Sequence, residues 1–181
     1  VGEIDVLVVF ANRAIVLQAK SKKLRLESRK GNDNLLAEDF KKAIQDSYDQ
    51  GLSCAKLIQE EKYKLLDASK NELTIRNDFK EIYIFCVVSD HYPALAFQTQ
   101  QFLKFEENKK IKPPFVMDIF LLDVMSEMLS NPLYFLSYTN KRTTYFKNFF
   151  AQSEYSILSY HLKKNLYLSD EYSMMMIDDS V

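Results

Sequence analysis

Two short apolar runs near the start of the chain place the strongest constraint on its fold. The runs Ile4–Phe10 and Ala14–Leu17 are separated by the link Ala11-Asn12-Arg13. Strand-forming runs joined by a few turn-forming residues predict a β-hairpin. A hairpin brings the end of its second strand beside the start of its first, so distant residues within Glu3–Leu24 become neighbours.

Polar side chains mark the end of the hairpin where the first strand starts and the second finishes. Asp5 lies at the start of the first run, and Gln18 and Lys20 follow the second. Because side chains alternate along a strand, Glu3 shares a face with Asp5, and Gln18 shares one with Lys20. In the matching register, a carboxylate, an amide oxygen and an ammonium converge. Such a set can hold a hard cation and a water molecule.

A long amphipathic helix is predicted after the hairpin, from about Leu35 to Leu66. Apolar and small residues at steps of three and four form its inner face, namely Leu36, Phe40, Ala43, Ile44, Ser47, Gly51, Ala55 and Ile58. The small residues Ser47 and Gly51 predict close packing, against the sheet. Gln50 borders this face and Gln45 lies opposite, so if one glutamine of this helix reaches the polar cluster, the geometry favours Gln50. The alternative for Gln50 is an ordinary boundary residue.

The remaining segments predict an α/β pattern followed by helices. Ile82–Val88 is almost wholly apolar and predicts a strand buried on both faces and parallel to a hairpin strand. Ala94–Phe97 predicts a short strand and Phe115–Leu129 a mostly buried helix. The aromatic-rich segment Leu133–Phe150 is expected in the core rather than stacked on bases, and a further helix is expected to start at Ser153-Glu154.

We expect two parts in this chain, an α/β domain over residues 1–108 and an α-helical extension over residues 109–181. The extension packs on the first part or forms a subdomain. The acidic, Met-rich tail Ser169–Val181 predicts a partial helix or a poorly ordered end. The sequence begins at Val1, directly before a strand, so we expect it to be part of a longer polypeptide with further elements before the hairpin.

Composition excludes several classes of protein. The 181 residues, 47% hydrophobic, suffice for a domain with a core, and the net charge of −1 confines any nucleic-acid surface to a local patch. None of the three glycines has the spacing of a Rossmann or P-loop site, and the histidines His91 and His161 cannot form a His-rich zinc site. Cys54 and Cys86 are expected to be reduced core residues of a cytoplasmic protein. No run reaches the roughly 18 apolar residues of a membrane span.

A strongly basic segment, Lys20–Lys30, contains the single acid Glu27. It is either a solvated connection or a rim that contacts phosphates beside the polar cluster, as in a DNA-binding site. In the second case the DNA-contacting side chains are Lys22, Lys23, Arg25, Arg29 and Lys30.

Asp5, followed thirteen positions later by Gln18-Ala19-Lys20 at the ends of paired strands and before a long helix, resembles the PD-(D/E)XK nuclease superfamily. The stretches GEID and AIVLQAKS are similar to Mrr-type restriction nucleases and to the nuclease-related NERD domain, in which Gln replaces the acidic residue of the second motif. The resemblance covers about residues 1–100 and implies a restriction-endonuclease-like mixed sheet. The chain from Lys109 onward resembles no family that we can name.

The resemblance implies a metal-dependent DNA endonuclease that hydrolyses phosphodiesters with a metal-activated water. In that superfamily the Asp coordinates Mg²⁺, the acid or amide of the second motif completes the metal site, and the Lys positions or activates the water. These roles correspond to Asp5, Gln18 and Lys20. The main-chain carbonyl of Ala19 and the carboxylate of Glu3 are further candidate ligands, and Mn²⁺ is the alternative cation.

Two other functions stay open at this point. The same fold can serve as an inactive module for DNA binding or for assembly within a larger protein, and a structural interaction domain without nucleic acid is the third candidate. The sequence leaves open the cleavage specificity, the choice between DNA and RNA, and whether the chain forms a homodimer.

Overall fold

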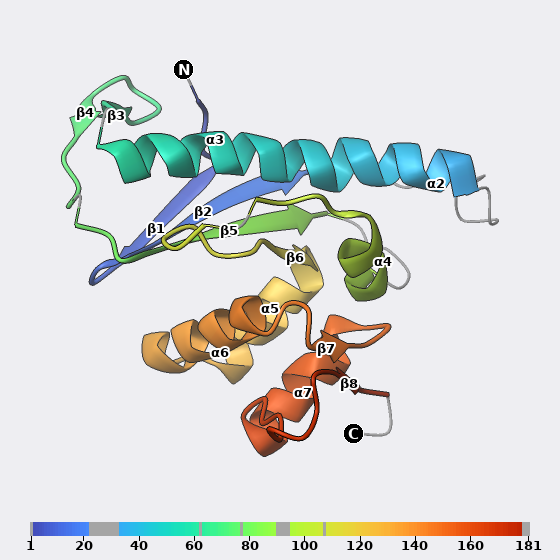
Figure 1. The fold of residues 1–181 in the computed structure, drawn as a ribbon. Coiled ribbons are helices and arrows are strands. Elements are labelled where there is room, and N and C mark those ends of the chain that lie inside the picture. Colours follow the sequence, from blue (N-terminus) through green and yellow to red (C-terminus); the bar gives the residue numbers. More distant parts are fainter. Residues whose placement is uncertain are drawn as a thin grey trace.

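A four-stranded mixed sheet between two helical layers forms the core of the protein (Figure 1). The computed structural model describes residues 2–21, 33–61, 63–76, 78–89, 95–106 and 108–178. The strands of the sheet, in spatial order, are β1 (Val6–Phe10), β2 (Arg13–Lys20), β5 (Glu81–Val88) and β6 (Phe115–Asp118). β1 and β2 form the predicted antiparallel hairpin, and β2, β5 and β6 run parallel to one another. The mixed α/β class expected from the sequence is confirmed.

One long helical run crosses one face of the sheet (Figure 1) and consists of α2 (Asp33–Phe40), a π-helical turn η1 (Lys41–Gln45) and α3 (Asp46–Glu60). The long helix predicted for this region is therefore confirmed. It ends earlier than predicted because Glu61 adopts a left-handed backbone conformation (φ 57°) that stops the helix. The next residues form the small antiparallel pair β3 (Leu65–Leu66) and β4 (Glu72–Leu73).

Close packing at a glycine fixes α3 on the sheet. A Cβ atom at Gly51 would lie 2.7 Å from Ile84 Cγ2 of β5 and 3.4 Å from Gln18 Cγ of β2. Ser47 is fully buried on the same face of the helix. The close approach predicted from Ser47 and Gly51 is confirmed, and it holds α3 against β5 and against the end of β2 that carries Gln18.

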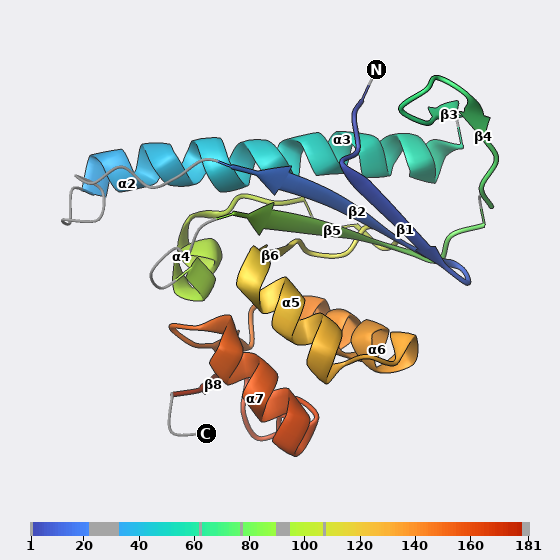
Figure 2. The ribbon, with the colours of Figure 1, turned by 180° about the vertical axis from the view of Figure 1, so that it is seen from behind.

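The opposite face of the sheet is covered by the C-terminal half (Figures 1 and 2), which contains α5 (Ile119–Met128), α6 (Pro132–Thr144) and α7 (Glu154–Lys164). Aromatic rings join the sheet to these helices. Phe85 meets Phe115 edge to face at 5.3 Å between ring centroids, and Phe115 meets Tyr138 of α6 at 5.9 Å. Tyr138 and Phe149 are fully buried, as expected for core aromatics, whereas Tyr134 is exposed.

Three predictions for the second half of the chain were wrong in detail. Phe115–Asp118 is strand β6 rather than the first turn of a helix, because these four buried residues pair with β5. A short strand was predicted over Ala94–Phe97. The described residues of this segment instead belong to helix α4 (Leu95–Phe102), which buries Leu95, Ala96 and Thr99. The tail contains β8 (Met175–Met176), which pairs in parallel with β7 (Phe149–Phe150).

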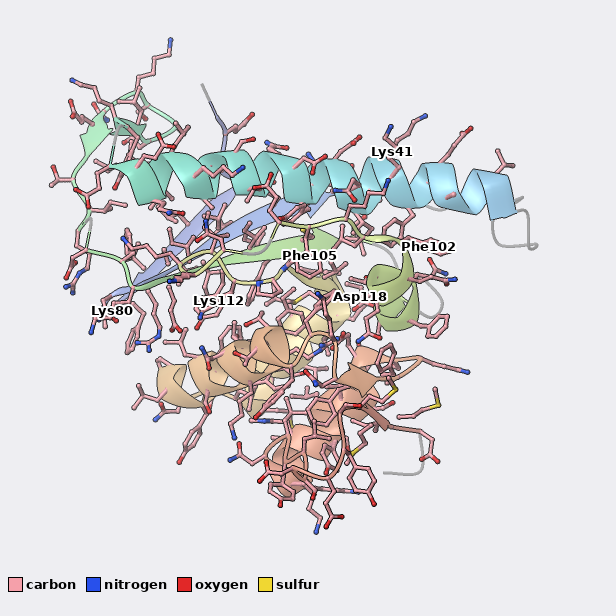
Figure 3. All side chains as sticks on the ribbon, in the orientation of Figure 1. Lys41, Lys80, Phe102, Phe105, Lys112 and Asp118 are labelled. Atoms are coloured by element: carbon pink, nitrogen blue, oxygen red, sulfur yellow. The ribbon has the colours of Figure 1, made fainter. Side chains whose placement is uncertain are left out.

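The helical layer and the sheet therefore share the segment after residue 108, which supplies β6 as well as α5, α6 and α7. In Figure 3, Asp118 lies where β6 passes into α5. Its Oδ1 accepts a hydrogen bond from Leu121 N at 2.8 Å and so caps the helix. Among the helices in the described part of the chain, none is both long and apolar enough to cross a membrane.

Candidate functional site

The polar residues predicted to converge lie together where β2 ends. Val6 pairs with Leu17 across the hairpin, so Asp5 lies beside the last residues of β2. The main-chain N–H of Ala19 donates a hydrogen bond to Asp5 Oδ2 at 2.7 Å. The register therefore brings the Asp5 carboxylate to the Gln18-Ala19-Lys20 segment, and its position is fixed by the backbone of β2.

Gln18 is fully buried beneath α3, an unusual place for an amide. Its Nε2 donates to the main-chain carbonyl of Glu3 at 2.8 Å, whereas its Oε1 has no hydrogen-bond partner among the residues that the structure describes. A buried acceptor without a partner costs about 1–3 kcal/mol. A bound cation or water molecule at Oε1 would recover that free energy, so this atom is a candidate ligand.

Lys20 points to the same helix. Its Nζ donates to Gln50 Oε1 at 2.7 Å, and Gln50 Nε2 donates in turn to the Glu3 carbonyl at 3.3 Å. The prediction that Gln50 rather than Gln45 reaches the cluster is confirmed. Gln45 instead binds the main chain of Lys104, donating from Nε2 at 2.9 Å and accepting at Oε1 at 3.0 Å.

The carbonyl oxygen of Glu3 ties the start of the hairpin to β2 and α3. It accepts hydrogen bonds from Gln18, from Gln50 and, at 3.4 Å, from Cys54 Sγ. Glu3 thus joins the cluster through its main chain, while its carboxylate as a metal ligand stays a prediction. Ala19 contributes its N–H, and its carbonyl as a ligand likewise stays a prediction.

Two polar contacts that support the site were not predicted from the sequence. Ser47 Oγ donates to the carbonyl of Gln18 at 3.3 Å, and Cys54 contacts Glu3. Ser47, Gln50, Gly51 and Cys54 follow the spacing i, i+3, i+4 and i+7 on α3, and this spacing was the available signal. Burial raises the pKa of the Cys54 thiol and raises that of Cys86 to about 12, which agrees with their prediction as reduced core residues.

The donor set suits a hard cation bound weakly. Asp5 offers one carboxylate and Gln18 one amide oxygen, and Mg²⁺ prefers oxygen ligands while retaining several waters. Within the described ranges, no three His, Cys, Asp or Glu side chains gather in a way that could hold a metal ion. The unpartnered Gln18 Oε1 is the observation that fits a cation at this end of the sheet.

The predicted DNA-contacting residues Lys22, Lys23, Arg25, Arg29 and Lys30 lie outside the described residues, as does His91. The described histidine, His161, is buried against Tyr138 in the C-terminal half, with 4.8 Å between the ring centroids. Burial lowers its pKa to about 4. At neutral pH the imidazole is therefore uncharged, and it is enclosed in the core of the C-terminal half.

A second polar cluster joins the start of β5 to α6. Glu81 pairs with Arg13 at 2.7 Å and with Lys112 at 3.2 Å, and it accepts hydrogen bonds from Tyr83 at 2.9 Å and Asn140 at 3.2 Å. Figure 3 shows Lys112 near the start of β5. Burial raises the pKa of Glu81, but the hydrogen bonds from Tyr83, Lys112 and Arg13 more than offset it and leave the pKa below its usual range. Because the oxygens of Glu81 already make these ion pairs and hydrogen bonds, we interpret the cluster as a structural brace between β5 and α6.

An apolar hollow of about 430 Å³ lies between the hairpin and helices α5 and α6. Val8 and Phe10 of β1 and Leu122 and Phe135 of the helices are typical of its lining. Among the described residues that line it, the polar side chains are Ser126, Ser130 and Arg13, and Arg13 is paired with Glu81. The polar cluster at the end of β2, which brings a carboxylate, an amide and an ammonium together, is the better candidate site.

Comparisons of the chain with protein-family models, with curated proteins and with solved structures find no match.

Proposed function

We propose that this chain is a metal-dependent nuclease that hydrolyses DNA phosphodiesters at the cluster of Asp5, Gln18 and Lys20. The observation that carries the proposal is the buried amide oxygen of Gln18, which has no partner among the described residues and lies on the strand that also carries Lys20. Asp5 is held at the same strand end by Ala19 N. The hairpin, long helix and parallel strand support a restriction-endonuclease-like fold.

The three side chains have different roles in this proposal because they differ in charge. The carboxylate of Asp5 and the amide oxygen of Gln18 hold a divalent cation, Mg²⁺ or Mn²⁺. When bound, such a cation offsets the charge that develops on the phosphate oxygens and lowers the pKa of water. The ammonium of Lys20, held by Gln50, adds a positive charge and a hydrogen-bond donor for the phosphate or the attacking water.

A plasmid-nicking assay with Mg²⁺ or Mn²⁺ tests this function. We expect cleavage that stops with EDTA and falls about 100-fold or more in Lys20→Ala. Asp5→Asn is the sharper variant, because its side-chain oxygen can still accept the hydrogen bond from Ala19 N while the charge for the cation is lost. Lys163→Ala, at an exposed lysine of α7, is the matched control and should cleave like the wild type.

Cleavage that survives both Asp5→Asn and Lys20→Ala would show that the chemistry lies elsewhere. No cleavage of supercoiled or single-stranded DNA with either cation would contradict the enzymatic proposal for these substrates.

The neutral Gln18 favours one alternative, a catalytically inactive nuclease-fold module. A single carboxylate holds a cation less strongly than two, and the described residues contain no group of three acidic, His or Cys ligands. Such a module would bind DNA with an affinity that falls as salt rises and would not cut it. A chain that neither cuts nor retains DNA would instead be an interaction domain without nucleic acid.

A further inference from the structure

Gln50 is held in one orientation by the groups on its two sides. Its Oε1 accepts from Lys20 Nζ at 2.7 Å and its Nε2 donates to the Glu3 carbonyl at 3.3 Å. An ammonium can only donate and a carbonyl can only accept, so a flipped amide would lose both hydrogen bonds. The contacts therefore fix which end of the amide faces Lys20.

The backbone on which Gln50 stands is also fixed. Its neighbour Gly51 brings α3 so close to the sheet that a Cβ there would lie 2.7 Å from Ile84 Cγ2. The Glu3 carbonyl is held from a second side by Gln18 Nε2 at 2.8 Å. Gln50 thus links the ammonium of Lys20 to α3, which packs closely on the sheet, and to the Glu3 carbonyl, which is also bound by Gln18 of β2.

The lack of charge on Gln50 is as important as its position. A carboxylate at position 50 would form an ion pair with Lys20 and neutralise it, whereas an amide oxygen accepts the hydrogen bond and leaves the positive charge in place. Gln45, five residues earlier on this helical run, makes no such contact and binds the main chain of Lys104.

We propose that Gln50 is a positioning residue that holds the Lys20 ammonium in place and leaves its full charge for a phosphate group of the substrate. This inference rests on the proposed function for the nature of the substrate, and on the contacts alone for the positioning. It assigns Gln50 a role through Lys20, without contact with the reacting atoms.

Two substitutions separate position from charge, because both remove the Nε2 hydrogen bond to Glu3 and differ at the end that faces Lys20. Gln50→Met keeps the charge of Lys20 and removes its anchor. Gln50→Glu keeps an anchor and cancels the charge. Gln45→Met is the control on the same helical run. Circular dichroism establishes that each variant folds.

The first measurement is binding to a fluorescein-labelled DNA duplex without divalent cation at increasing KCl. We expect the slope of log affinity against log salt to fall by about 1 in Gln50→Glu, as in Lys20→Ala, because one phosphate contact is lost. Gln50→Met should keep the wild-type slope and affinity in this binding experiment. In the cleavage assay with Mg²⁺, the same variant should lose about 100-fold in kcat at unchanged KM, because the ammonium is misplaced. Equal behaviour of the two Gln50 variants in slope and kcat would overturn the inference.

The second measurement needs no activity. In ¹H–¹⁵N spectra of lysine ammonium groups, the Lys20 signal, identified by its absence in Lys20→Arg, should be visible in the wild type and in Gln45→Met and be lost in Gln50→Met. A Lys20 signal unaffected by Gln50→Met would overturn the positioning role. A held ammonium in a chain that neither binds nor cuts DNA would support positioning and overturn the phosphate as its partner, and that result is distinct from failure of the positioning role itself.

Discussion

The substitution Gln18→Glu tests the cation site without any substrate. Gln18 is fully buried, and its Nε2 donates to the Glu3 carbonyl at 2.8 Å. Glutamate has nearly the same shape, but its ionised form places an acceptor against that carbonyl and a charge in the core. The protonated form can still donate to Glu3, so the cost of the substitution depends on pH.

Burial disfavours the charged form and raises the pKa of the new carboxyl above its usual value of about 4.3. A shift of about two units lowers the free energy of unfolding by about 2.7 kcal/mol at pH 8. Because the folded-state pKa lies above the unfolded one, this loss is absent below about pH 4, grows as pH rises toward the folded-state pKa and is constant above it.

Urea denaturation between pH 4 and pH 8 measures this difference, with Gln18→Met as the control that removes the hydrogen bond without adding a charge. We expect the loss in Gln18→Met to be independent of pH. Mg²⁺ should restore Gln18→Glu at neutral pH, by about 2.7 kcal/mol when its concentration is one hundred times Kd. A loss in Gln18→Glu that does not vary with pH would refute the burial argument, and no recovery with Mg²⁺ or Mn²⁺ would refute the cation site.

Two further substitutions test the packing that supports this arrangement. Gly51→Ala places a Cβ 2.7 Å from Ile84 Cγ2 and should cost about 1–3 kcal/mol in urea denaturation, whereas a loss below about 0.5 kcal/mol would show that α3 can move off the sheet. His161 has a pKa lowered to about 4 by burial and by Lys141, below its unfolded value of about 6.5, so stability should fall by up to about 3 kcal/mol as pH drops from 6.5 to 4. His161→Phe, which keeps a ring against Tyr138, should remove that slope, and an unchanged slope would assign it to other groups.

The geometry of the polar cluster could be predicted because it depends on short-range periodicity. Alternation along the two hairpin strands places Asp5 opposite the end of β2, and the observed register does so through the pair Val6–Leu17. The angular spacing of a helix separates Gln50 from Gln45, and the structure shows the same separation. Both patterns repeat every few residues, so neither requires knowledge of distant parts of the chain.

The second half was less predictable because its pattern is ambiguous or depends on distant partners. In Phe115–Leu129 nearly every residue is apolar, and a buried strand and a buried helix then have the same hydrophobic pattern. Asp118 marks the change from β6 to α5 as an N-cap and was the available signal. The pairing of Phe149–Phe150 with Met175–Met176 joins two-residue segments that carry no local strand pattern.

Strand β2 connects the proposed site to the stability of the fold, because its two ends are held by different halves of the chain. Arg13, at its start, belongs to the brace in which Glu81 also binds Lys112 and Asn140 of the C-terminal half. Lys20, at its end, is held by α3 and lies about 23 Å from Arg13 at the usual rise per residue.

A chain cut after residue 108 would keep every described side chain of the proposed site. It would nevertheless lose β6, the strand that pairs with β5, and the helices that cover Tyr83 and Phe85 on the opposite face of the sheet. The exposed edge and apolar face would weaken β5, and β2 pairs with β5 along its whole length, from Arg13 to Lys20. Residues that take no part in the proposed chemistry therefore determine whether the strand that carries it stays in place.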